Sequence, residues 1–117
     1  MLAVFYAVER EGGKNGPWVF AGVANDQNAA SDIVKRTVED EKDLMREKGR
    51  HGIRYSIIAT GSTEDESERF IITEITGYYG PMMHAKKPKS SSITVIHFKA
   101  RVCEFNEIVN YAPDGNE

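Results

Sequence analysis

The fold of this protein is decided by the stretch from Asp26 to Gly49, which reads DQNAASDIVKRTVEDEKDLMREKG. Its apolar residues recur at intervals close to three and four positions, a spacing that aligns them along one side of an α-helix. These residues are Ala30, Ile33, Val34, Val38, Leu44 and Met45. Asn25 or Asp26 can cap the helix, with Ser31 as a later alternative, and Gly49 permits the left-handed conformation that often ends one. A helix that is apolar on one side has to lie against another layer of structure.

The segments before the helix have the length and composition of β-strands. Residues 2–9 and 18–24 each alternate between two sets of side chains, and the turn-forming residues between them indicate a hairpin. The connecting loop contains GGKNGP, and glycines of this kind also occur in loops that bind phosphate. Phosphate-binding loops lead from a strand into a helix, whereas this loop leads from strand into strand. We therefore interpret it as a hairpin loop.

Three clear strands are predicted after the helix, and a fourth is favoured at residues 105–111. Residues 53–60 and 70–78 are separated by the exposed, acidic sequence GSTEDESE, so they should pair antiparallel. Residues 93–104 form the longest strand candidate, and its alternation separates two faces. The residues expected to face the helix are Ile96, Phe98, Ala100 and Val102, and those expected to face away are His97, Lys99 and Arg101. Residues 105–111 fit either a strand or a short helix, and we favour a strand.

These elements predict one α+β domain over residues 1–112, followed by a frayed tail at 113–117. The expected element order is ββαββββ, with an antiparallel sheet of five or six strands and one long helix packed across one face. The other face of the sheet is expected to carry apolar residues, namely Phe5, Val19, Ile58 and Ile71. Monomers of this size rarely expose a large apolar patch, so we predict a homo-oligomer in which a second subunit covers this face.

Composition narrows the class of protein. The chain of 117 residues is 40% hydrophobic and 28% charged, which is typical of one globular domain. No apolar run approaches the length of a membrane span, and the first residues lack the basic segment of a signal peptide. The single Cys103 excludes an internal disulfide and a zinc knuckle. These features predict a cytoplasmic protein that does not associate with membranes.

Charge is distributed unevenly along the chain. No Asp or Glu occurs between Glu74 and Glu104, although the net charge is -3. The candidate ligand-binding residues in and beside this basic zone are Tyr79, His84, Lys86, Lys87, Lys89, His97, Lys99 and Arg101. Cations can hold the phosphates of a nucleotide or nucleic acid while tyrosines stack on bases. The alternative is that the lysines keep a loop soluble and that the strand cations pair with acids across the sheet.

No cofactor, metal site or catalytic constellation is predicted. The acidic run Glu64, Asp65, Glu66 and Glu68 lacks the glycine and the ladder of oxygen donors found in calcium loops, and we interpret it as a solvated turn. Cys103 could act as a nucleophile with His97 or His84 as its base. Any chain of this length with one Cys and three His offers such a pairing, so a structural thiol is favoured.

Three classes of function follow, in order of preference. The first is a non-catalytic binding or inhibitor protein that acts through a protein surface. The second is binding of a nucleotide or nucleic acid through the basic loop at 84–89 and the strand residues His97, Lys99 and Arg101. The third is a small enzyme that uses Cys103 or His97.

Overall fold

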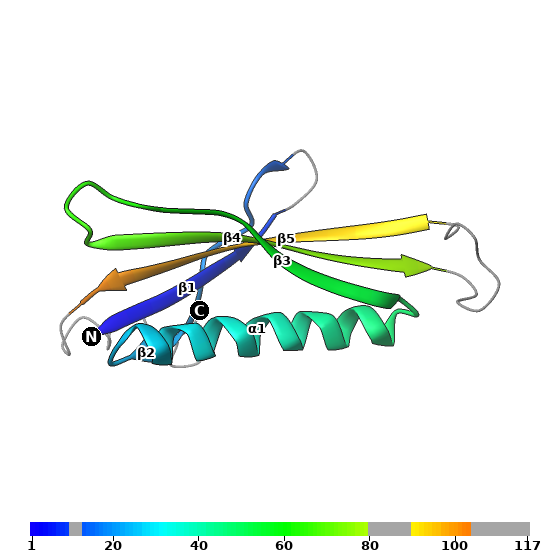
Figure 1. Cartoon of the computed structure of the whole chain (residues 1–117), viewed down its shortest axis with the longest axis horizontal. Coiled ribbons are helices and arrows are strands. Elements are labelled where there is room, and N and C mark those ends of the chain that lie inside the picture. Colours follow the sequence, from blue (N-terminus) through cyan, green and yellow to red (C-terminus); the bar gives the residue numbers. More distant parts are fainter. Residues whose placement is uncertain (10–12, 80–89, 104–117) are drawn as a thin grey trace.

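The computed structural model describes residues 1–9, 13–79 and 90–103, which contain five strands and one helix (Figure 1). The elements are β1 (Leu2–Val8), β2 (Val19–Ala24), α1 (Gln27–Glu47), β3 (His51–Ser62), β4 (Glu68–Tyr79) and β5 (Ser90–Val102). The strands form one antiparallel sheet in the order β2-β1-β5-β4-β3, and α1 lies along one face of it. The predicted α+β class, the single long helix and the five-strand sheet are confirmed. The predicted sixth strand, the tail at 113–117 and the end of the domain at residue 112 lie outside the described residues.

Both ends of α1 are set by local chemistry. Asp26 is the N-cap, with extended backbone, and its Oδ1 accepts a hydrogen bond from the backbone N–H of Ala29 at 2.9 Å. At the other end Gly49 has a φ of 83°, its N–H donates to the carbonyl of Arg46, and the N–H of Arg50 donates to the carbonyl of Met45. These two bonds form the Schellman arrangement that a left-handed residue closes. The predicted start and end of the helix are confirmed.

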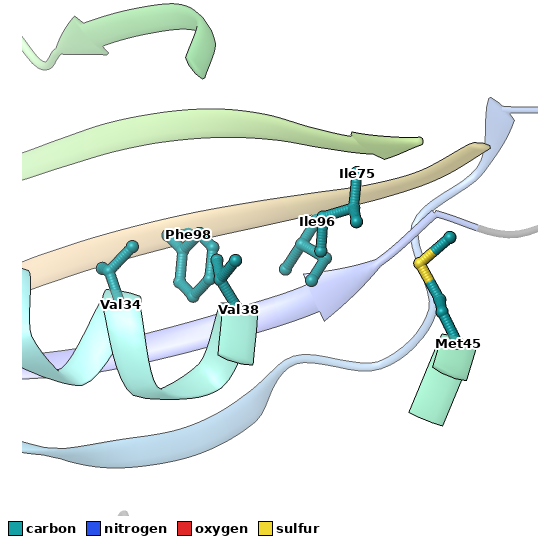
Figure 2. Close-up of a cluster of buried hydrophobic side chains, with 6 residues drawn as sticks. All are labelled: Val34, Val38, Met45, Ile75, Ile96 and Phe98. Carbon is teal, nitrogen blue, oxygen red and sulfur yellow. The ribbon is translucent and has the colours of Figure 1, made fainter. Parts of the chain in front are cut away.

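One apolar cluster joins α1 to the centre of the sheet. Val34, Val38 and Met45 project from the helix onto the β4 and β5 side chains Ile75, Ile96 and Phe98 (Figure 2). A second cluster of Val4, Ala24, Ala30 and Ile33 joins the start of the helix to β1 and β2. Five of the six predicted helix contacts are buried, but Leu44 is exposed. Leu44 precedes Met45 by about 100° around the helix, and only Met45 faces the sheet.

The β1–β2 connection is a hairpin, as predicted. β1 pairs antiparallel with β2, and the N–H of Gly16 donates to the carbonyl of Val8 at 2.8 Å. A bulge between Val4 and Phe5 in their pairing with β2 shifts the alternation of β2 by one residue. Val19 therefore lies opposite Tyr6, whose side chain packs in the cluster under α1, so its predicted place on the other face is wrong.

Alternation in β5 places most side chains as predicted. Ile96 and Phe98 are buried beneath α1, and Ala100 packs against the second cluster. Val102 is the exception, since this last residue of β5 is exposed. Ile71 lies opposite Phe98 and packs in the cluster on the helix side, so its predicted place on the other face is also wrong.

Candidate functional site

The face of the sheet away from α1, here called the open face, carries the three cations predicted on β5. The Nε2 of His97 lies 2.9 Å from the Oε2 of Glu9. The Nζ of Lys99 lies 4.4 Å from the ring centre of Trp18 and 5.5 Å from that of Phe5. These distances fit an ion pair, when the imidazole is protonated, and two cation–π contacts.

Arg101 ends this row of cations. It is exposed and lies directly opposite Glu68 of β4. Opposite charges at such positions attract each other across the sheet. The carboxylates of Glu9, beside His97, and of Glu68, on the residue opposite Arg101, add negative charge to this face and weaken its attraction for an outside phosphate.

Aromatic and aliphatic side chains surround the cations on the open face. The rings of Phe5 and Phe20 meet edge to face with centres 5.6 Å apart. Phe70 of β4 lies opposite Lys99, and Ile72 lies opposite His97. Each of these four apolar side chains is half-buried, while Trp18 in the β1–β2 connection is exposed. Among the described elements no helix covers this face (Figure 1).

The described residues at the two ends of the basic loop lie far from the β5 cations. His84, Lys86, Lys87 and Lys89 lie outside the described residues. Tyr79 is the last residue of β4, paired with Ser90 at the start of β5, and only its backbone is described. His97 is seven positions after Ser90 along an extended strand, a distance of about 23 Å. The ends of the loop are thus far from the row formed by His97, Lys99 and Arg101.

Cys103 and His97 are not arranged as nucleophile and base. Cys103 is buried directly after β5, where its N–H donates to the carbonyl of Met1 at 3.0 Å. It is six residues from His97 along an extended chain, which corresponds to about 20 Å. A general base must be within hydrogen-bond reach of its nucleophile or one water away. His97 instead contacts Glu9.

The acidic connection between β3 and β4 is held together by Asp65. Its carboxylate accepts hydrogen bonds from the backbone N–H and the hydroxyl of Ser67, at 3.0 and 2.8 Å, and from the hydroxyl of Thr63 at 2.8 Å. The two bonds from Ser67 and the one from Thr63 lower the pKa of Asp65 from its usual 3.8 to about 2. Within the described residues no group of three His, Cys, Asp or Glu is placed to hold a metal ion.

The lowered pKa of Asp65 predicts a pH-dependent role in this turn. A carboxylate whose pKa is lower in the folded state stabilises that state above the unfolded pKa, and the effect disappears as the pH falls through the folded pKa. Asp65→Asn should therefore destabilise the protein relative to wild type at pH 6, and the difference should shrink between about pH 4 and pH 2. Chemical denaturation at a series of pH values measures this. Glu64→Gln removes the same charge from the turn and serves as control; an equal effect in that variant would contradict the prediction.

A cleft of about 560 Å³ lies between the first half of α1, the last part of β3 and the first part of β4. Its apolar lining includes Val34, Ile57, Ile71 and Phe98. Tyr55 also lines it, and burial raises the pKa of this tyrosine. Figure 1 shows the β3–β4 hairpin bending away from the helix at this end. Sequence reasoning missed the cleft because the bend of a hairpin leaves no pattern in the residues.

No known protein family, curated protein or solved structure matches this chain. No helix in the described parts of the chain is long and apolar enough to cross a membrane. The candidate surfaces therefore have to be interpreted from their own chemistry.

Proposed function

We propose that this protein is a non-catalytic binding protein that holds another protein on its open face. The observation that carries the proposal is the uncovered row of apolar side chains formed by Phe5, Phe20, Phe70 and Ile72 beside the exposed ring of Trp18. Aromatic residues are enriched in the cores of protein interfaces, where a few of them supply most of the binding energy.

The charges on this face favour a protein partner over a phosphate-rich one. His97 contacts the carboxylate of Glu9, and the ammonium of Lys99 lies over the rings of Phe5 and Trp18, so a partner that covers this face meets cations that already have contacts within the chain. An uncompensated buried charge would oppose association, whereas a paired one costs far less. The exposed Arg101 lies two residues from Lys99 along β5, and polar residues at the border of an apolar centre are usual in interfaces.

Binding of a single-stranded nucleic acid is the second candidate. It is favoured by one arrangement: the Nζ of Lys99 lies over Trp18 and Phe5, with Arg101 two residues further along β5. Single-strand binders combine cations that hold the backbone with rings on which bases stack. A single strand long enough to span the roughly 23 Å from His97 to Ser90 would also reach the end of β5 from which the basic loop at 84–89 starts.

Removing the ring of Trp18 tests the first proposal. Trp18→Ala should reduce recovery of the partner proteins that wild type retains from an extract of expressing cells by at least about tenfold, the loss expected at an aromatic hot spot. Leu44→Ala shortens an exposed apolar side chain on α1 and should leave recovery unchanged. Quantitative mass spectrometry of the retained proteins measures both. Identical sets of proteins on wild type and Trp18→Ala would contradict the proposal.

A salt titration separates the two candidates. Wild type is titrated with a mixed-sequence single-stranded oligonucleotide at rising salt, beside a variant in which Lys86, Lys87 and Lys89 are all Ala. Contacts to phosphates release counterions, so true nucleic-acid binding weakens steeply as salt rises. Tight, salt-dependent binding that the triple variant loses would replace the protein partner with the second candidate.

A further inference from the structure

The strand β3 ends the sheet without a neighbour on its outer side within the described residues. It is 12 residues long, whereas β2 at the opposite edge has 6. The backbone N–H and C=O groups along an outer edge can pair with another strand. The two edges thus differ in how much pairing surface they offer.

The sequence of β3 carries little protection against such pairing. Natural edge strands are blunted by charged residues, proline or bulges. The segment from Tyr55 to Ser62, YSIIATGS, contains no charged residue and no proline. Its protection is a bulge between Ile57 and Ala59 in the pairing with β4. Beside this bulge Ile57 and Ile58 are 53% and 52% exposed.

We propose that β3 pairs antiparallel with β3 of a second copy of this chain, about a two-fold axis, to form one continuous ten-stranded sheet. A strand and its own copy always present matching edges in this arrangement, and the contact closes after two subunits. The middle of β3 is uncharged, so pairing it with itself brings no like charges together. That neutrality favours a second copy over a charged peptide as the occupant.

The position of the exposed isoleucines supports this arrangement. Ile57 lines the cleft on the helix side of β3. Ala59 lies opposite Ile72, a residue of the open face, so the strand changes face across the bulge that contains Ile58. An added strand would run along the outer side of the cleft and cover both isoleucines of each subunit. The contact uses the sheet edge and not the open face, so its test is independent of the proposed function.

Ile58→Lys is the variant that tests the pairing. Wild type should sediment in analytical ultracentrifugation at twice the chain mass of 13.1 kDa. Ile58 lies near the middle of the uncharged segment from Tyr55 to Ser62, so pairing this segment with its copy would bring two lysines close together, and the variant should raise the dimer dissociation constant by about a hundredfold or more. Ile93→Lys is the control, since Ile93 is 60% exposed but lies in β5, which β4 separates from β3. It should remain dimeric.

Hydrogen exchange locates the contact. The amides of residues 55–62 that point outward from β3 should be protected in wild type and in Ile93→Lys, and should exchange quickly in Ile58→Lys. If Ile58→Lys fails to fold, Thr60→Lys at an exposed position of the same strand replaces it. A wild type that stays monomeric at millimolar concentration overturns the proposal. So does a dimer that Ile58→Lys and Ile93→Lys weaken equally, because it would use another surface.

Discussion

Replacing Phe98 with Ala should lower the free energy of unfolding by about 3–5 kcal/mol, the usual cost of removing a buried aromatic ring. Phe98 is 2% exposed and belongs to the cluster that joins α1 to the sheet (Figure 2). Its ring centre lies 6.3 Å from that of Tyr6, so the variant also removes a ring contact. The cavity would open between the helix and the middle of the sheet, where neither layer can collapse without moving the other.

Phe70→Ala is the matched control for this change. Phe70 is the same residue type on the neighbouring strand, but it lies half-buried on the open face. Its loss should cost about 1 kcal/mol, since water already reaches part of the ring. Urea denaturation followed by circular dichroism measures both variants. Equal losses would mean that the open face carries as much of the core as the helix side does, against the burial described above.

The ends of α1 could be predicted because their causes are local. Asp26 reaches an N–H three residues away, and Gly49 adopts its left-handed conformation within the last turn. Neither contact depends on how the strands are ordered. The same locality explains why the α+β class was predictable, since a single amphipathic helix flanked by strand-like segments has few ways to bury its apolar side.

Face assignments were predictable only where alternation is regular. In β5, charged and apolar residues alternate strictly from Ile96 to Arg101, and the predicted faces hold there. Val19 was misplaced because a bulge shifts the register, and a bulge has no sequence signature in this segment. Ile71 was misplaced because β4 is apolar on both faces near this residue, so the pattern does not select one.

The contacts of the candidate site depend on the topology of the sheet. Glu9 and His97 are 88 positions apart, and they meet because β1 and β5 are neighbours. Sequence reasoning placed Lys99 on the correct face but could not foresee that Trp18 would lie over it. Likewise, the exposure of Ile58 follows from the position of β3 at the end of the sheet, and strand order cannot be deduced from alternation.

Gly77→Val should lower the free energy of unfolding by about 1–3 kcal/mol, although valine is a better strand former than glycine. Gly77 lies in β4 beneath the end of α1. A Cβ added there would be 3.0 Å from the Cε of Met45 and 3.2 Å from the Cβ of Arg50. The Met45 methyl group can move, but the Arg50 Cβ is fixed by the turn that ends the helix. The end of α1 would therefore be pushed away from the sheet.

Gly61→Val is the control, because no atom beyond the two chain neighbours of Gly61 lies within 4 Å of a Cβ added there. Its effect should stay within about 0.5 kcal/mol, measured at low protein concentration so that any pairing of β3 does not contribute. A double variant identifies the cause. If the clash with Met45 accounts for most of the cost, Gly77→Val combined with Met45→Ala should lose less stability than the two single losses added together. Strict additivity would instead assign the cost to Arg50 and to the backbone of β4.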